Sequence, residues 1–481
     1  MTSYITKSRV LSGLRCPKRL WLQTFQPELA QESATSQLTI AAGIELGKLA
    51  RLNYPGGILI GHVEKPGQAV LETSQLLAHK NSAPLFEAAF LHNDTLVRTD
   101  ILVPVNGGWR MVEVKSAGSV KDHHLLDCAV QLCVLENSGI TVQEVCVAHV
   151  DTGFEYAGDG NYQGLIVEED VTEKVRVLLP DVPAWLASHR DTLANPMPTV
   201  RMGRQCTNPD CQFLAHCEKD LPEYPVSILP NAKKILEELQ GAGIEDIRDI
   251  PDGMLQNERH IMVWQATRDG RPFVSPQLKQ ELSLLPYPRF YLDFETINLA
   301  IPRWKGTRPH QQLPFQWSCH IERLNGMLEH REFLDASGDV PMRAFAESLI
   351  AALEIDGPII VYGTFESTVL NQLIQFCPGL EARLQGIIDR LVNLLPWLRS
   401  YYYHPAMKGS WSIKAVLPTV APHLDYSQLE DVQNGTLAQL AYLEITDPKT
   451  APAIREQKIR NLLKYCELDT QAMVEVVWFF E

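Results

Sequence analysis

The sequence predicts an α/β protein of two domains that are joined by a helical connector. Its 481 residues are more than one hydrophobic core ordinarily organises. Segments of alternating apolar and polar residues predict strands in both halves of the chain, and helically patterned segments separate those strands. We expect the first domain to span residues 1–220, the connector residues 221–285 and the second domain residues 286–481.

The composition is typical of a globular protein. Hydrophobic residues make up 45% and charged residues 21% of the chain, and no apolar run is long enough to cross a bilayer. The basic N-terminal segment has no apolar core of a signal peptide, so we expect a cytoplasmic protein with no membrane partner. The net charge of −15 argues against a non-specific nucleic-acid coat. A local basic cluster that includes Lys7 indicates either phosphate contacts or a solvated face.

The first domain begins with helical patterning and continues in the order strand, strand, helix, strand. The predicted strands are TLVRTDILVPV (95–105), GWRMVEVKS (108–116) and VQEVCVAHV (142–150), and the helix is VKDHHLLDCAVQLCVLENSG (120–139). Alternate residues of a strand share a face, so Glu113 and Lys115 point the same way and a hairpin brings Asp100 beside them. Two carboxylates and a lysine suit metal-assisted phosphodiester hydrolysis, although a surface Glu–Lys pair is also common.

These residues resemble the PD-(D/E)XK nucleases of the RecB-like branch. Asp100 matches the family aspartate, Glu113 and Lys115 match its ExK motif, and Gln131 matches the glutamine of the following helix. The resemblance implies that Asp100 and Glu113 hold Mg²⁺ or Mn²⁺. His124 and Asp127 are further candidates to face this site, and in the segment AAGIELGKLAR Glu45 stands where the branch usually has a histidine ligand.

The second domain opens with the strand RFYLDFETIN (289–298), and the strands FQWSCHIERL, LEHREFLDA and PIIVYGTF follow. Asp293 and Glu295 share one face of the first strand, where an acidic pair among apolar residues is costly unless a cation binds it. In the last helix, Tyr465 and Asp469 are four residues apart and therefore stacked. Glu366 ends another predicted strand.

This set resembles the DnaQ-like (DEDD) 3′→5′ exonucleases, which have an RNase H-like fold. The resemblance makes Asp293, Glu295, Glu366 and Asp469 ligands of two metal ions about 3.5–4 Å apart, with Tyr465 orienting or deprotonating the attacking water. Glu366 replaces the aspartate that is usual in that family. Asp389 resembles a supporting aspartate that follows the middle motif.

The cysteines divide into two groups. Six of the ten lie in apolar segments and are predicted to be core residues, namely Cys128, Cys133, Cys146, Cys319, Cys377 and Cys466. The remaining set is Cys16, Cys206, Cys211 and Cys217, and all-thiolate ligation suits zinc or an iron–sulfur cluster. Some RecB-like nucleases, including the CRISPR-adaptation iron–sulfur exonucleases, place one cysteine before the core and three after it. That resemblance implies a 4Fe–4S cluster that clasps the domain, with Zn²⁺ as the alternative.

The whole chain resembles a bacterial family of two-nuclease fusion proteins whose C-terminal half is catalogued as a domain of unknown function. The resemblance implies a metal-dependent nuclease with two active sites, acting on DNA, on single strands or ends, in repair or phage defence, with protein partners in such a complex. One alternative is an RNA 3′→5′ exonuclease in which the C-terminal site alone works. The other is a non-catalytic subunit that binds nucleic-acid ends.

Overall fold

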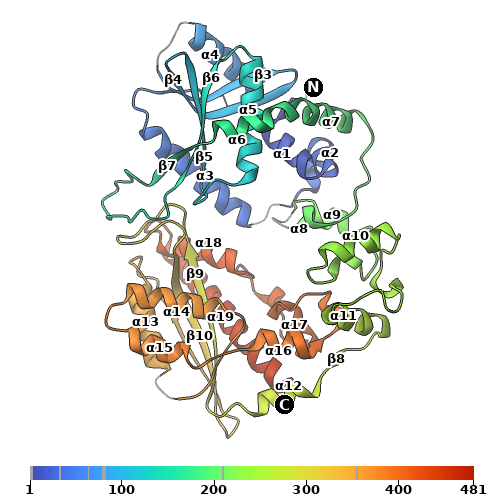
Figure 1. The fold of residues 1–481 in the computed structure, drawn as a ribbon. Helices are drawn as coiled ribbons and strands as arrows, with labels where there is room; N and C mark the ends of the chain where they lie inside the picture. Colours follow the sequence, from blue (N-terminus) through green and yellow to red (C-terminus); the bar gives the residue numbers. More distant parts are fainter. Residues whose placement is uncertain (1–3, 32–33, 63, 79–82, 208–210, 354–355) are drawn as a thin grey trace. The chain divides into compact units, whose positions relative to one another are not determined.

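The computed structural model describes residues 4–31, 34–62, 64–78, 83–207, 211–353 and 356–481 (Figure 1). The chain forms two compact units, of which unit 1 comprises residues 1–219 and 299–310, and unit 2 residues 220–298 and 311–481. Both units combine a sheet with helices, which confirms the predicted α/β class. Within the described ranges, no helix combines the length and hydrophobicity that crossing a bilayer requires.

Unit 1 is built on a seven-stranded sheet in the order β2-β3-β4-β5-β6-β7, and β1 pairs with β4. The three strands predicted from sequence, β4, β5 and β6, are confirmed, and β5 and β6 are parallel because α5 crosses between them. The strands are β1 (Ile5–Thr6), β2 (Ile58–Leu59), β3 (Leu85–His92), β4 (Thr95–Val105), β5 (Gly108–Lys115), β6 (Val142–Val150) and β7 (Ile166–Asp170).

Helices cover both faces of this sheet. Leu102 and Met111 face a core that is formed with α1, α5, α6 and α7, whereas their neighbours Ile101 and Val112 face Ala50 of α3. This alternation follows from the two-residue period of a strand. The helices are α1 (Lys7–Arg15), α2 (Pro17–Phe25), α3 (Ala34–Leu52), α4 (Pro66–Ala78), α5 (Asp122–Asn137), α6 (Thr172–Leu178), α7 (Val182–Ala194), α8 (Arg204–Thr207) and α9 (Leu214–Glu218).

The segment 299–310, which was predicted as part of the second domain, belongs to unit 1. Ile301 packs with Leu46, Val150 and Leu165 of this unit, and His310 donates from Nε2 to the carbonyl of Ser116 at 2.8 Å. The sequence prediction failed here because a loop between two strands carries no periodic pattern that indicates which core it joins.

Unit 2 has a five-stranded sheet in the order β11-β10-β9-β12-β13. The pairs β11–β10 and β10–β9 are antiparallel, whereas β9–β12 and β12–β13 are parallel. A second sheet pairs β14 with β8. The strands are β8 (Phe273–Val274), β9 (Arg289–Asn298), β10 (Gln312–Glu322), β11 (Leu328–Leu334), β12 (Ile359–Val361), β13 (Leu391–Asn393) and β14 (Tyr402–Tyr403).

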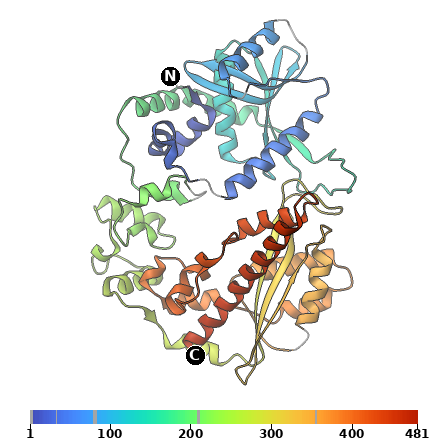
Figure 2. The same ribbon diagram turned by 180° about the vertical axis from the view of Figure 1, so that it is seen from behind.

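The long C-terminal helix α19 lies along one face of the five-stranded sheet (Figure 2). From β10, Gln316 donates to the carbonyl of Leu462 at 2.7 Å, while the neighbouring Trp317 donates to Ser348 of α13 on the other face at 2.9 Å. The helices are α10 (Lys233–Gly241), α11 (Glu258–Asp269), α12 (Pro276–Ser283), α13 (Met342–Ala352), α14 (Phe365–Phe376), α15 (Glu381–Ile388), α16 (Leu394–Tyr401), α17 (Ile413–Val420), α18 (Gly435–Thr446) and α19 (Pro452–Phe480).

The segment expected to be a connector is helical and lies within unit 2. Its α10, α11 and α12 contribute Leu239, Val263 and Leu278 to one core with Leu394 and Val474. The six cysteines predicted to be core residues are all buried, which confirms that prediction.

Gly409 offers a test of how the connector packs. Its φ is +75°, and a Cβ there would lie 1.8 Å from the carbonyl oxygen of Ile228. We expect Gly409→Ala to lower the free energy of unfolding by about 3 kcal/mol, because a left-handed backbone costs about 1 kcal/mol and displacing the carbonyl about 2 kcal/mol. Urea unfolding, followed by the fluorescence of the buried Trp411, measures this change.

Gly253→Ala is the matched control. Gly253 also has a left-handed φ of +80°, but nothing lies within 4 Å of its Cβ position, so about 1 kcal/mol is expected. Equal losses for the two variants would contradict the packing of Ile228 against Gly409.

Candidate metal-binding active sites

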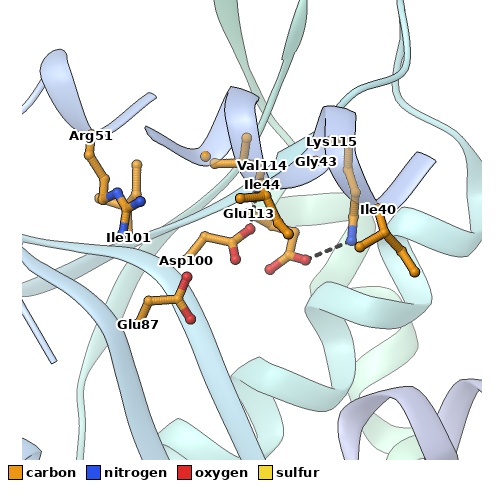
Figure 3. A pocket seen from close by; sticks show the side chains of 11 residues that line it. Ile40, Gly43, Ile44, Arg51, Glu87, Asp100, Ile101, Glu113, Val114 and Lys115 are labelled. Atoms are coloured by element: carbon orange, nitrogen blue, oxygen red, sulfur yellow. Dashed lines mark hydrogen bonds and ion pairs between the residues drawn. The ribbon is translucent and has the colours of Figure 1, made fainter. Parts of the chain in front are cut away.

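Unit 1 has a cavity of about 380 Å³ between α3 and the strands β3, β4 and β5. The carboxylates of Glu87, Asp100 and Glu113 point into the same space in Figure 3. Lys115 lies at the side of Glu113. The cavity therefore brings together three residues predicted from sequence, Asp100, Glu113 and Lys115, and adds Glu87.

The position of Asp100 follows from where two strands separate. The pairing of β4 with β5 extends from Val105 and Gly108 to Ile101 and Val112. One residue farther on, Oδ2 of Asp100 accepts a hydrogen bond from the backbone N–H of Val114 at 2.7 Å. The side chain therefore takes the place of a ladder hydrogen bond, which fixes its carboxylate beside Glu113.

Glu113 accepts hydrogen bonds on both carboxylate oxygens. Its Oε1 accepts from Nζ of Lys7 at 2.8 Å and of Lys115 at 2.6 Å, and its Oε2 accepts from Nε2 of Gln131 at 2.7 Å. Asp127 completes the network, because it accepts from Lys115 at 2.6 Å and from Gln131 at 3.2 Å. Gln131, predicted from sequence, thus orients the acid rather than lining the cavity itself.

The two central acids of this site differ in protonation. Burial opposes ionisation of Glu113, but the charges of Lys7 and Lys115 outweigh it and hold the pKa of Glu113 well below its usual range. Burial and the neighbouring charge of Glu113 raise the pKa of Asp100 to about 7. Glu113 is therefore a carboxylate at neutral pH, whereas Asp100 is partly protonated there, and a bound cation would favour its charged form.

Sequence reasoning missed Lys7 and Glu87 as site residues. Lys7 lies 106 positions before Glu113, and its partner acids Glu113 and Asp127 hold it in place rather than leaving it for phosphates. Glu87 interrupts the apolar run of β3 and has a left-handed φ of +58°. A lone acid in an apolar strand was the signal that could have identified it.

The structure does not bring Glu45 to this site. The face of α3 that lines the cavity carries Ile40, Gly43, Ile44 and Arg51. At 100° per residue Glu45 lies on the opposite face, where it is exposed and its charge acts on Tyr162. The prediction of Glu45 as a ligand is corrected for this reason. His124 instead caps α5, because its Nδ1 accepts from the N–H of Lys121 at 3.2 Å.

Unit 2 gathers its own carboxylates on the sheet face beneath α19. Ligand oxygens of Asp293, Glu295 and Asp469 all lie within 4.8 Å of one another. Asp293 and Glu295 come from β9 and Asp469 from α19. The alternation of β9 places both strand acids on the face that the helix covers.

Glu366 lies in the first turn of α14, not at the end of a strand as predicted, because β12 ends at Val361. Its charge acts on Asp293 and Glu295. Among the described residues, its buried Oε2 has no hydrogen-bond partner. An unpartnered buried carboxylate oxygen is costly, so its position beside the other acids fits a cation ligand. Asp389 is exposed at the end of α15 and accepts from Gln385 at 2.8 Å.

Two tyrosines and a lysine border these acids. Tyr426 donates to Oδ1 of Asp469 at 2.6 Å, and Nζ of Lys414 donates to the hydroxyl of Tyr465 at 3.2 Å. Lys414 also lies 4.9 Å from the ring centre of Tyr426 and 4.8 Å from that of Tyr465. Burial raises the pKa of both tyrosines, so they are neutral donors. The sequence signal identified Tyr465 but missed Lys414, near the start of α17, and Tyr426, in a short 3₁₀ turn, because neither belongs to a recognised motif.

The acids of unit 2 are protonated more readily than ordinary carboxyls. Burial raises the pKa of Glu295 to about 8, and the charge of Asp469 adds to it. Burial likewise raises the pKa of Glu366 to about 7 and that of Asp469 to about 6, in the latter case against the hydrogen bond from Tyr426. Burial also raises the pKa of Asp293. A bound cation would offset the repulsion between these carboxylates when they are ionised.

The four cysteines singled out from sequence gather at one place in unit 1. The thiol of Cys217 interacts electrostatically with those of Cys16, Cys206 and Cys211. All four are free of disulfide bonds. Cys16 lies between α1 and α2, and the N–H of Cys211 bonds to the carbonyl of Cys206 at 3.0 Å.

The surroundings of these thiols fit an anionic thiolate-bound group. Arg15 donates from Nε to the carbonyl of Gln205 at 2.8 Å, which ties the N-terminal helices to the later cysteines. Arg19 interacts with Cys16 and Cys211, and within the described ranges its buried Nε lacks a hydrogen-bond partner. This buried N–H of Arg19 lies beside four thiols and lacks an acceptor. The thiolates of a bound metal or cluster would supply one.

Comparison with known proteins gives relatives without an assigned activity. A family described as Domain of unknown function (DUF2779) matches residues 290–412, which include Asp293, Glu295 and Glu366. The chain is 26% identical over 226 residues to an uncharacterized protein, UU173, of Ureaplasma parvum serovar 3, covering 40% of this chain and 31% of that protein. The chain thus spans about a third of the length of this curated relative. A solved structure titled "Crystal structure of SSO0001" covers 46% of this chain and 88% of its own, at 17% identity and a TM-score of 0.23.

Proposed function

We propose that the protein is a metal-dependent nuclease that hydrolyses phosphodiester bonds of DNA, with one active site in each unit. The observation that carries the proposal is that each unit brings carboxylates together beside a hydrogen-bonded lysine. Buried acids of like charge are unfavourable without a cation, and divalent ions held this way polarise phosphates.

In unit 1, Glu87, Asp100 and Glu113 would hold Mg²⁺ or Mn²⁺. The ion would activate a water and withdraw charge from the phosphate. Lys115 is fixed between Glu113 and Asp127, both at 2.6 Å, so its ammonium is positioned to stabilise negative charge on the phosphate. Gln131 keeps Glu113 oriented through its bond at 2.7 Å.

In unit 2, Asp293, Glu295, Glu366 and Asp469 would hold the same class of ion. The hydroxyl of Tyr465 keeps its proton and accepts a hydrogen bond from Lys414. It can therefore orient a water by accepting or donating a further hydrogen bond. Tyr426 holds Asp469 in place. The residues supply positions and fixed charges rather than a covalent intermediate.

We extend the proposal to the finer fold classes. The order β4–β5–α5–β6, with the acids on β4 and β5 and Gln131 on α5, supports a PD-(D/E)XK core in unit 1. Three antiparallel strands followed by two parallel ones, with an acidic pair on β9 and Asp469 on the last helix, support an RNase H-like core in unit 2. These resemblances favour DNA as the substrate.

Site variants test the two-site nuclease. On labelled single-stranded DNA with Mg²⁺ or Mn²⁺, we expect Glu113→Gln to lower the cleavage rate of the unit 1 site and Asp293→Asn that of the unit 2 site. Each rate should fall by at least about 100-fold, because each variant removes a ligand charge. The double variant should show neither activity. Gel analysis of product lengths separates stepwise 3′ shortening from other cuts.

The exposed acids Glu169 and Asp269 provide controls, since Glu169→Gln and Asp269→Asn remove the same charge away from both clusters. Cleavage by the double variant at the rate of the unmodified protein would refute the proposal. Faster cleavage of RNA than of DNA of the same sequence would identify RNA as the preferred substrate.

The raised pKa values of unit 2 predict a pH-dependent stability. In the unfolded chain these carboxyls titrate near about pH 4, whereas the folded values for Asp469, Glu366 and Glu295 are about 6, 7 and 8. The folded state therefore binds more protons between about pH 4 and 8, and the metal-free protein loses stability as pH rises through this range. Thermal unfolding in EDTA measures it.

Two comparisons make this prediction specific to the acids. Glu295→Gln should flatten the decline, because the glutamine has no proton to lose, and Asp269→Asn should leave it unchanged. Mg²⁺ should restore stability most at pH 8. A melting temperature that is independent of pH in EDTA would contradict the buried carboxyl cluster.

We further propose that Cys16, Cys206, Cys211 and Cys217 hold a 4Fe–4S cluster, with Zn²⁺ as the alternative. Four converging thiols satisfy the ligand count of either group, and Arg15, Lys18 and Arg19 compensate negative charge. The bound group would be structural, since it closes a long loop between residues 16 and 206.

Anaerobic purification tests this assignment. We expect a brown protein that contains iron and acid-labile sulfide, and Cys16→Ser should lose both and unfold at a lower temperature. Cys377→Ser, which alters a buried cysteine of unit 2, is the control that should retain the colour. A colourless protein with one equivalent of zinc would replace the cluster by Zn²⁺.

A further inference from the structure

A second cluster of ligand-type side chains lies on the face of the unit 2 sheet that α19 covers. It consists of His320 on β10, His330 on β11 and Glu467 on α19, whose ligand atoms lie within 4.8 Å of one another. His320 and His330 are directly paired across the two antiparallel strands, with ring centres 4.6 Å apart. Three elements therefore converge on this point, and none of these side chains belongs to the nuclease sites proposed above.

Two hydroxyl groups fix one nitrogen of each imidazole ring. Nδ1 of His320 lies 2.8 Å from the hydroxyl of Thr470, and Nε2 of His330 lies 2.9 Å from the hydroxyl of Ser318. The two hydroxyl oxygens are themselves 2.9 Å apart. Such contacts to the far side of a ring are what orient histidine ligands around metals.

One arrangement of the hydroxyl hydrogens satisfies the whole network. Thr470 donates to the carbonyl of Glu467 at 3.0 Å, and Ser318 donates to Thr470. In that arrangement neither hydroxyl has a hydrogen left for a ring, so His320 donates from Nδ1 and His330 from Nε2. In neutral rings, this leaves the lone pairs on Nε2 of His320 and Nδ1 of His330.

In this arrangement the free nitrogen of His330 faces a negative charge. Nδ1 of His330 lies 3.7 Å from Oε1 of Glu467, and a lone pair facing a carboxylate is repulsive. Burial, with the neighbouring His330, lowers the pKa of His320 to about 4, so that ring is neutral at pH 7. The side chains of His330 and Glu467 are 22% and 44% exposed, which leaves the cluster open to solvent ions.

We propose that His320, His330 and Glu467 bind a divalent transition-metal ion, with Zn²⁺ the best match. Two imidazole nitrogens are borderline ligands that favour Zn²⁺ over Mg²⁺, one carboxylate oxygen is a third ligand that zinc accepts, and water would fill the fourth tetrahedral position. The ion joins β10 and β11 to α19 two residues before Asp469. An ion bound there would hold the helix that carries an acid of the neighbouring carboxylate cluster.

Equilibrium dialysis of the full chain against Zn²⁺, with excess Mg²⁺ to occupy the carboxylate sites, tests the proposal. We expect His330→Gln and Glu467→Gln each to bind one equivalent less than the unmodified protein at the same free Zn²⁺. Ser318→Ala removes an orienting hydroxyl and should weaken that equivalent about 10- to 100-fold. Circular dichroism verifies that each variant is folded.

His423 and Glu475 give the matched control, because His423, in the turn after α17, lies 3.9 Å from Glu475 of α19 and is 66% exposed. His423→Gln should retain the full zinc stoichiometry. The same stoichiometry in His330→Gln and the unmodified protein would overturn the site. So would an equal loss in His423→Gln. If the unmodified protein binds this zinc equivalent but has no nuclease activity, the result counts against the proposed active sites and not against this one.

Discussion

The burial of like-charged carboxylates is the constraint on which both units depend. A buried carboxylate loses its hydration, and neighbours of the same charge raise the cost further. Unit 1 meets this cost with two lysines, since Lys7 and Lys115 both contact Glu113. Unit 2 has Lys414 near its acids and otherwise relies on protons, which is why its carboxyls have raised pKa values. The ion pairs of the first cluster therefore form without a metal ion, whereas the second cluster keeps acids whose charged form a bound cation would stabilise.

The elements that carry the charges are those with the least freedom to move. Asp100 replaces a hydrogen bond of the β4–β5 ladder, so its carboxylate is as fixed as the strand itself. Gln131 lies on α5, which is buried along most of its length. In unit 2, Thr470 of α19 bonds to Ser318 of β10, and it neighbours Asp469 in the sequence. Rigid supports of this kind hold ligands in place before an ion arrives.

Strand patterns predicted β4, β5 and β6 of unit 1 and β9, β10, β11 and β12 of unit 2, and motif spacing singled out the acids of both clusters except Glu87. The bounds of β4, β6 and β9 agree with those expected, because alternation is a local property of the chain. Local patterns could not place Glu45, whose helix face is set by the packing of α3, or Lys7, whose partner lies 106 residues away. Glu366 was expected at a strand end because its apolar neighbours continue past the point where β12 stops.

The cysteine group and the first carboxylate cluster are mechanically linked through α1. This helix begins at Lys7 and ends at Arg15, directly before Cys16, so its nine residues span about 13 Å. Arg15 bonds to the carbonyl of Gln205, next to Cys206. Whatever holds the four thiols together therefore fixes the far end of the helix that presents Lys7 to Glu113. If the four cysteines separated, Lys7 would move away from the buried Glu113. The cost of that uncompensated charge links the stability of the cysteine group to the electrostatics of the carboxylate cluster.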